Sequence, residues 1–228
     1  MSLQYTIEAV AHIENGYTDK FGIPKQSGMI SGAESLIVFE QGYRSPEALR
    51  GIEGWSHLWL IWQFSENTDK GWSPTVRPPR LGGNKRVGVF ATRSPYRPNS
   101  LGLSCVRLIG AEQHPTYGTV LRVAGADLMN GTPIFDIKPY VAFADSVPDA
   151  ADGLARFEED KQAITRAELG SEIEKLPAEE RPLLREILLN DPRPAYHDDP
   201  EREYGFGFHG HEVKFRVEGG TVYLTKII

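Results

Sequence analysis

The chain has 228 residues, of which 40% are hydrophobic and 25% charged, and its formal net charge at pH 7 is -6. This composition supplies enough apolar material for one substantial core and a smaller appended one, which excludes a disordered or fibrous protein. Hydrophobic runs such as 58–62 are far shorter than the roughly 20 residues that cross a bilayer. We expect no transmembrane segment, and because no secretory signal is visible at the N-terminus we expect a cytoplasmic protein.

Metal and disulfide chemistry have little support in the residue content. The single cysteine, Cys105, excludes an intrachain disulfide framework and a zinc site built on cysteine. His57 has no second or third ligand at metal spacing, so a core or rim histidine is the simpler interpretation. We therefore expect no metal site.

Short segments rich in Val, Ile, Leu and aromatic residues, bounded by Gly, Pro and Asn, predict strands before residue 145. These strands are expected at 3–13, 35–39, 56–64, 86–92, 101–109, 118–126 and 134–141. Helical periodicity is weak in this part, apart from a short helix at 45–49 with Ser45 as its cap. Regularly spaced strands with little helix favour a mainly β fold, a compact β-barrel, over a doubly wound α/β domain.

The pattern changes after a polar, helix-breaking stretch at 145–153, where we place a domain boundary. Apolar residues recur at helical spacing in 154–169 and in 178–189. Residues 212–224 alternate, turn at two glycines and return, which predicts a β-hairpin with Phe215 opposite Leu224. We thus expect a barrel domain over residues 1–145 and a small α+β domain over residues 154–228. A unit of that size is marginal unless it leans on the barrel or on a second subunit.

A basic run interrupts this acidic chain. Eight basic residues and no acidic residue lie between Lys70 and Ala111, so the remainder carries -6 minus 8, or -14. Pro95 and Pro98 restrict the backbone on either side of Arg97, which stiffens the loop. Such a loop favours a preformed site for a phosphate or a carboxylate. A solvated basic face or a structural ion-pair network is the alternative.

A second polar motif spans residues 127–140. Asp127 and Asn130 close a predicted strand, and a turn role is as consistent with them as a functional one. Asp136, Lys138 and Tyr140 alternate along the next strand and are expected on one face, either a site or a solvent-exposed rim. Other patterns are weaker. The aromatic strand at 55–64 is typical of a core, the Gly-Phe repeat at 205–211 could stack bases or form a bent strand, and no Rossmann or Walker signature occurs.

Several of these segments together resemble the TsaA-like family, also called TrmO. They are P-K-Q (24–26), W-S-H-L-W (55–59), R-V-G-V-F-A-T-R-S-P-Y-R-P-N (86–99) with L-G-L-S after it, and D-L-M-N-G-T-P-I-F-D-I-K-P-Y (127–140). The resemblance covers about residues 1–145, and the later D-P-R-P-A-Y and Y-G-F-G-F segments are similar to the tail of bacterial members.

The resemblance implies a β-barrel methyltransferase that works as a homodimer, with S-adenosylmethionine near the subunit interface. It implies methyl transfer to the exocyclic amine of N(6)-threonylcarbamoyladenosine, which lies 3′ of the anticodon in threonine tRNAs. The implied cofactor contacts are Pro24, Lys25, Gln26, Phe64, Ser65, Arg93, Leu103, Asp127, Asn130, Gly131 and Thr132. Two departures stand out: many relatives have Asp-Gly-Thr where this chain has 130–132, and a basic residue or His where it has Ser65-Glu66.

A methyl donor of this kind needs an aligned nucleophile, a dry pocket and a proton acceptor. As that acceptor we predict Asp136, with Tyr140 second. Arg77, Arg80 and Arg97 are predicted to face the RNA, and the C-terminal unit to grip tRNA or the partner subunit. Two other functions remain open at this stage, a non-catalytic tRNA-binding module and a small-molecule methyltransferase on the same barrel.

Overall fold

The computed structural model describes residues 3–19, 22–67, 71–78, 85–151, 163–193 and 199–228. Strands dominate these residues. The α-helices that they contain are short, Ala142–Asp145 (α1) and Arg181–Leu189 (α2), and the other helical segments are single 3₁₀ turns. The prediction of a mainly β chain with little helix is confirmed.

Six strands of the N-terminal part form a closed ring in the order β1-β2-β7-β6-β3-β8, because β8 pairs again with β1. Their bounds are β1 Ala11–Glu14, β2 Glu34–Phe39, β3 His57–Gln63, β6 Leu101–His114, β7 Gly118–Ala124 and β8 Pro133–Pro139. All neighbouring pairs in the ring are antiparallel. Alternation along β3 directs Leu58, Leu60 and Trp62 into the ring. Fully buried apolar residues from all six strands or their ends fill this core.

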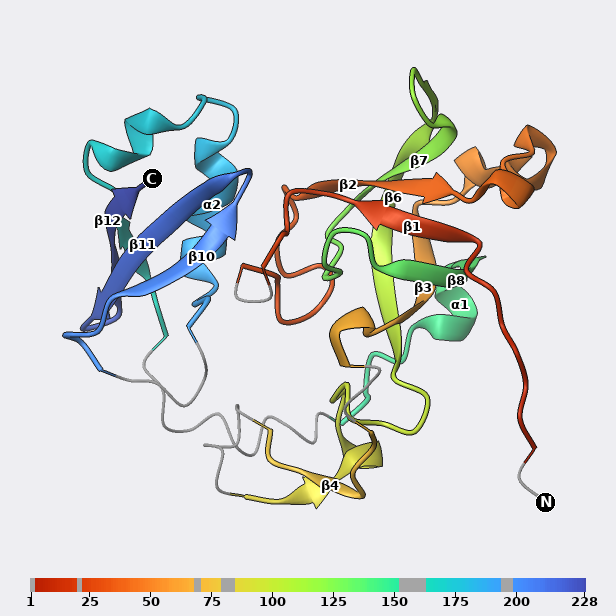
Figure 1. The fold of residues 1–228 in the computed structure, drawn as a ribbon, viewed down its shortest axis with the longest axis horizontal. Coiled ribbons are helices and arrows are strands. Elements are labelled where there is room, and N and C mark those ends of the chain that lie inside the picture. Colours follow the sequence, from red (N-terminus) through yellow and green to blue (C-terminus); the bar gives the residue numbers. More distant parts are fainter. Residues whose placement is uncertain (1–2, 20–21, 68–70, 79–84, 152–162, 194–198) are drawn as a thin grey trace.

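The C-terminal unit, residues 163–193 and 199–228, is built on a four-stranded sheet in the order β10-β11-β12-β9. Its strands are β9 Arg166–Glu168, β10 Tyr204–Phe208, β11 His211–Glu218 and β12 Thr221–Ile227. Leu184, Ile187 and Leu188 of α2 are buried in the same core as the aromatic residues of this sheet. Figure 1 shows the unit on the left and the ring on the right, with the small pair β4 (Thr75–Val76) and β5 (Val87–Gly88) below them.

The loop between β1 and β2 joins these two parts. We call residues 15–33 the β1–β2 loop; two of them, 20 and 21, lie outside the described residues. Tyr17, Ile30 and Ala33 of this loop are buried in the core of the C-terminal unit, beside Phe206 and Phe208. Figure 1 accordingly shows the loop, in red, between the ring and the unit.

Several predicted elements are confirmed. Strands at 35–39, 56–64, 101–109, 118–126 and 134–141 correspond to β2, β3, β6, β7 and β8, although β6 continues to His114. The predicted hairpin forms β11 and β12, with Val217 opposite Val222 and Phe215 opposite Leu224. The second predicted helix is α2, and the helix predicted at 45–49 is a 3₁₀ turn, Pro46–Leu49.

Other element predictions are wrong for identifiable reasons. Residues 3–10 carry an alternating pattern, but Leu3, Tyr5 and Ile7 are exposed and only Ala11–Glu14 finds partner strands. The strand predicted at 86–92 ends after Val87–Gly88, because its partner among the described residues, β4, has two residues. In the predicted helix 154–169, residues 154–162 lie outside the described residues, while Arg166–Glu168 forms β9, parallel to β12. Tertiary pairing at the sheet edge overrides local helical periodicity there.

Replacing Phe206 by alanine tests whether the Gly-Phe repeat is core. Phe206 is 2% exposed, and we expect Phe206→Ala to lower the free energy of unfolding by about 3 kcal/mol or more, because it empties a packed site. Urea denaturation measures this change. The control is Tyr223→Ala, whose side chain is 39% exposed in the same sheet. Equal effects of the two changes would contradict the assignment of Phe206 to the core.

Candidate functional site

A cavity of about 520 Å³ opens where β3 ends and β6 begins. Four segments far apart in the sequence line it: residues 23–26 of the β1–β2 loop, the end of β3 and the residues after it, the segment 92–103, and the turn 127–132. The wall is mixed, with Trp62, Phe64 and Leu103 supplying apolar surface and Lys25 and Arg93 supplying positive charge. A cavity of this kind fits a ligand with both apolar and charged parts.

The structure brings together nine of the eleven residues predicted to contact the cofactor. Those that line the cavity are Pro24, Lys25, Gln26, Phe64, Ser65, Arg93, Leu103, Asp127 and Thr132. Asn130 and Gly131 do not line it, although they lie in the turn between Asp127 and Thr132. Arg97, predicted to face the RNA, lines the same cavity. Trp62 and Met129 also line it, and their apolar patterns had not singled them out.

Asp127 is the acidic group most enclosed by this site. Burial raises the pKa of its carboxyl, against hydrogen bonds from Ser104 and from two backbone N–H groups and against the charge of Arg93. Ser104 is 1% exposed; its hydroxyl donates to Asp127 Oδ1 at 2.5 Å and accepts from Trp62 Nε1 at 2.9 Å. One of the backbone donors is the N–H of Ser27, in the β1–β2 loop. Hydrogen bonds therefore connect Asp127 to β6 and to the β1–β2 loop.

The arginines of the cavity are held by neighbouring oxygen atoms. Arg93 donates from Nη1 to the side-chain oxygen of Gln26. Arg97 donates from Nη1 to the backbone oxygen of Thr92 at 2.8 Å, so its guanidinium braces its own loop. The Thr92 hydroxyl in turn accepts from the backbone N–H of Ser94 at 3.2 Å. The loop thus combines proline restriction with internal hydrogen bonds, and it presents both guanidinium groups in defined positions.

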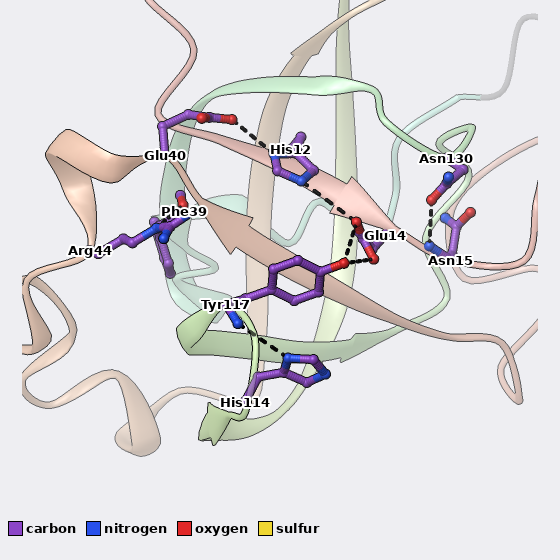
Figure 2. A network of polar contacts seen from close by, with 9 residues as sticks. All are labelled: His12, Glu14, Asn15, Phe39, Glu40, Arg44, His114, Tyr117 and Asn130. Atoms are coloured by element: carbon purple, nitrogen blue, oxygen red, sulfur yellow. Dashed lines mark hydrogen bonds and ion pairs between the residues drawn. The ribbon is translucent and has the colours of Figure 1, made fainter.

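Asn130 and Gly131 fasten the turn behind the cavity. Figure 2 shows the Asn130 side chain beside Asn15, whose backbone N–H donates to Asn130 Oδ1 at 2.9 Å. The Asn130 backbone N–H donates to the Tyr17 oxygen, and the Gly131 N–H donates to the Ile13 oxygen at 2.8 Å. Gly131 has a φ of 76°, which glycine tolerates. The amide of Asn130 therefore has a structural role here.

The remaining residues of Figure 2 form a polar network on the ring that is separate from the cavity. His12 Nδ1 lies 2.8 Å from Glu40, and the hydroxyl of Tyr117 donates to both Glu14 oxygens at 2.9 Å. None of these residues lines the cavity. The network connects the strands of the ring through their outer side chains.

Asp136 and Tyr140 are not among the residues that line the cavity. They share one face with Lys138, as the alternation predicts, but it is the outer face of the ring. Asp136 lies opposite Ile61 and Lys138 opposite Trp59, on the side of β3 that faces away from the core. A bulge sets this phase, because β8 skips Phe135 between the partners of Ile61 and Trp62. Asp136 pairs with Lys138 at 2.9 Å. Its place on the outer face, away from the cavity, does not support a role as the proton acceptor.

Arg77 lies on an arm next to the cavity, which we define as residues 71–78 and 85–100. Its segments are joined by the β4–β5 pair and by hydrogen bonds from Ser73 to Tyr96 and from Val89 to Pro74. Arg77 is exposed; Arg80 lies outside the described residues. The arm also carries Trp72 and Phe90, which are 56% and 75% exposed. The role predicted for this segment rests on its charge and its prolines, whereas the exposed aromatic side chains carry no sequence signal that distinguishes them from core residues.

Within the described ranges, no group of three or more His, Cys, Asp or Glu side chains is arranged to hold a metal ion. No helix among the same residues is long and apolar enough to cross a membrane.

Comparisons with known proteins agree with this geometry. Residues 12–146 match the family model described as the tRNA-methyltransferase O N-terminal domain, and residues 158–228 match the TrmO C-terminal domain. The tRNA (adenine(37)-N6)-methyltransferase of Escherichia coli strain K12 is 40% identical over 226 residues, which are 93% of each chain. A protein of the same name from Eikenella corrodens is 45% identical over 174 residues, 76% of this chain and 97% of that one. The crystal structure of TrmO from Pseudomonas aeruginosa has a TM-score of 0.78 to this structure, with 28% identity over 99% of both chains. The chain belongs to the TrmO family.

The raised pKa of Asp127 predicts a pH-dependent cost in stability. A carboxyl whose pKa is higher in the folded state contributes stability at low pH, and that contribution is lost as pH rises from the ordinary value of 3.8 through the folded pKa. At pH 7, Asp127→Asn is therefore expected to be at least as stable as the wild type, and its advantage should shrink as pH falls toward 3.8. Urea denaturation over a pH series measures the difference.

Asp136→Asn is the matched control, since that carboxylate is half-exposed and pairs with Lys138. Its effect on the free energy of unfolding should be within about 0.5 kcal/mol. If Asp127→Asn instead becomes relatively less stable with rising pH, the assigned direction of the Asp127 pKa shift is wrong.

Proposed function

We propose that this chain is an S-adenosylmethionine-dependent methyltransferase that acts on the exocyclic amine of N(6)-threonylcarbamoyladenosine, beside the anticodon of threonine tRNA. The observation that carries the proposal is the convergence of nine predicted cofactor contacts, from four separate segments, on one cavity. A relative that matches 93% of the chain is named tRNA (adenine(37)-N6)-methyltransferase. Neither a non-catalytic binding module nor a small-molecule methyltransferase accounts for both facts.

The chemistry requires alignment and one proton transfer. S-adenosylmethionine would supply the methyl group: its carbon–sulfur bond would break as the bond to the amine nitrogen forms, and a neutral thioether would leave. The nitrogen then gives up its proton to a base. Holding the two reacting atoms in line in a site that excludes water provides most of the rate enhancement that the protein can supply. The enclosed apolar side chains Trp62 and Phe64 fit that requirement.

We propose Asp127 as the proton acceptor, in place of Asp136. Asp127 lines the cavity, is largely buried, and has a raised pKa. With a sulfonium donor bound in the cavity, Asp127 would lie near a cation before transfer and near a neutral thioether after it, so its affinity for a proton would rise as the amine loses its own. The hydrogen bond from Ser104 fixes the orientation of the carboxyl group. In the same assignment Lys25, Gln26 and Arg93 contact the polar part of the cofactor.

The arm is proposed to bind the anticodon loop. Protein side chains recognise single-stranded RNA loops by stacking on aromatic rings and by contacting phosphates with arginine. Trp72, Phe90 and Tyr96 are 39–75% exposed on the arm, which also carries Arg77. The chain is acidic overall, so this basic, aromatic surface is where a polyanion is expected to dock.

The architecture and assembly follow from the same assignment. We propose that the ring of six strands is a compact β-barrel domain over residues 1–145 and that residues 154–228 form a small α+β domain; the two family-model matches support this division. We further propose a homodimer, because β6 leaves two large apolar side chains exposed: Leu103, at the cavity, is 56% exposed, and Ile109, further along the strand, is 40% exposed. A tRNA substrate would place the enzyme in the cytoplasm.

The decisive experiment is nucleoside mass spectrometry of threonine tRNA incubated with the enzyme and S-adenosylmethionine. The wild type should add the mass of one methyl group to the hypermodified adenosine. Asp127→Asn should reduce the turnover number at least about a hundredfold, as expected for loss of a general base. Asp136→Asn should retain turnover close to that of the wild type. An unmodified nucleoside with the wild type would refute the function, and a fully active Asp127→Asn would refute only the assignment of the base.

The RNA contact is tested by salt dependence. Arg77→Ala should weaken tRNA binding and reduce the slope of log affinity against log salt by about 1, since one phosphate contact is lost. Trp72→Ala should weaken binding with the slope unchanged, because stacking carries no charge. Arg50→Ala is the control, being 78% exposed on the ring and paired with Glu47. An unchanged slope for Arg77→Ala would place the tRNA elsewhere.

A further inference from the structure

The β1–β2 loop contributes both to the cavity and to the core of the C-terminal unit. Its residues 23–26 form one wall of the cavity. Tyr17, Ile30 and Ala33, on either side of that wall, are buried in the core of the C-terminal unit. The position of the cavity wall therefore depends on residues more than a hundred positions away in the sequence.

Glu186 of α2 is the polar link between the unit and the loop. Its Oε1 accepts the backbone N–H of Ser31 at 2.8 Å, and its Oε2 accepts the backbone N–H of Gly32 at 3.3 Å. The Ser31 hydroxyl also donates to Oε1, at 3.4 Å. A carboxylate that receives two consecutive backbone N–H groups holds the main chain itself, and bonds to a charged acceptor are stronger than neutral ones. Ile187 and Leu188, next along the helix, are buried and fix α2 in the unit.

The packing around these bonds leaves little freedom for the loop. A Cβ atom at Gly22 would lie 2.8 Å from the ring of Phe206, and one at Gly16 would overlap His209. Both aromatic residues belong to the C-terminal unit. The backbone of the loop therefore lies directly against the C-terminal unit at two points. Only glycine fits at these positions, because any side chain would collide with the unit.

The ring side of the loop is tied to the catalytic elements. Gly28 donates its N–H to the Gly125 oxygen at 2.8 Å, and the Cys105 N–H donates to the Ser27 hydroxyl oxygen at 3.2 Å. The Ser27 N–H donates to Asp127, and Arg93 donates to Gln26. A shift of the loop would thus be felt at the cavity, both at Asp127 and at Arg93.

We propose that the C-terminal unit acts as a clamp on the cofactor wall of the cavity, and that Glu186 is the positioning residue through which it acts. This inference rests on the proposed cofactor site. It differs from the expectation that the unit grips tRNA or a partner subunit, because every contact that carries it lies within one chain. With the clamp released, the loop samples other conformations and must be ordered each time the cofactor binds, so the apparent affinity falls by the fraction of competent loop.

The test is Glu186→Ala in the full-length protein, with S-adenosylmethionine binding measured by calorimetry and methyl transfer by steady-state kinetics. We expect the Kd and KM for S-adenosylmethionine to rise about tenfold, as loss of two charge-assisted bonds would cause. The turnover number at saturating cofactor and the Kd for tRNA should stay within about twofold, because bound cofactor orders the loop and restores its contact with Asp127. A merely structural role would lower the melting temperature and the active fraction without moving KM.

Two further variants make the result specific. Glu186→Gln keeps one oxygen acceptor for Ser31 and should restore most of the affinity. Glu172→Gln is the matched control: Glu172 Oε2 likewise accepts a backbone N–H, that of Ile227 at 2.8 Å, and pairs with Lys175, but both partners lie within the C-terminal unit. Glu172→Gln should leave the KM for S-adenosylmethionine unchanged. If Glu186→Ala is poorly folded, the KM values of Glu186→Gln and Glu172→Gln for S-adenosylmethionine are compared instead, and a rise confined to Glu186→Gln supports the clamp.

The outcomes are separable. A raised KM for the Glu186 variants alone supports the clamp. An unchanged KM, an equal rise in Glu172→Gln, or a loss confined to tRNA affinity would overturn it. Failure of the wild type to bind S-adenosylmethionine would refute the proposed function itself, and with it the clamp, whereas wild-type binding that Glu186→Ala leaves intact would refute the clamp alone.

Discussion

The site depends on the short pairing that closes the ring between β1 and β8. Only Ala11 with Ile134 and His12 with Pro133 are paired as strand residues, and flanking bonds from Val10 to Ile134 and from Ile13 to Thr132 extend the contact. Pro133 has no N–H to donate, so the chain just before it turns away. That turn carries Asp127 at one end and Thr132 at the other, and both reach the cavity. An open sheet would leave the turn without its anchor on β1 and would expose two strand edges.

The charge around the cavity differs from that of the whole chain, and burial sets the pKa of its acid Asp127. The chain as a whole is acidic, yet Lys25, Arg93 and Arg97 line the cavity together with two acids, Glu66 and Asp127, and Arg77 lies on the arm. A buried carboxyl of this kind costs stability when it is ionised, since desolvation opposes its charge. Ser104 and the backbone N–H of Ser27 offset part of that cost. A fold retains such a group when its charge is used, which is why functional sites concentrate shifted pKa values.

Most strands of the ring could be predicted from the sequence, because they are apolar segments bounded by Gly, Pro and Asn and several of them alternate in polarity. β3 alternates over seven residues, and its inward face was predictable once one face was buried. The side of the ring on which Asp136 lies was not predictable, because a bulge at Phe135 shifts the phase of β8 relative to β3. β9 was not predictable either. Its three residues lie in the segment 154–169, whose apolar residues recur at helical spacing, and they form a strand because they pair with the edge of β12. The shared core of the β1–β2 loop is invisible to any local pattern, since Tyr17 and Leu188 are far apart in the chain.

The sequence by itself determined the mainly β character, the hairpin at the C-terminus, the stiff arginine loop and the motifs that assign the family. Each of these depends on residues close together in the chain, through alternation, turn glycines or proline restriction. Only the tertiary structure decided which polar residues meet: Asp127 joins the cavity while Asp136 pairs with Lys138 on the outer face, and Glu186 holds the loop that carries Gln26. The physical reason is that strand phase and inter-unit packing depend on bulges and long-range contacts, which local sequence patterns do not encode.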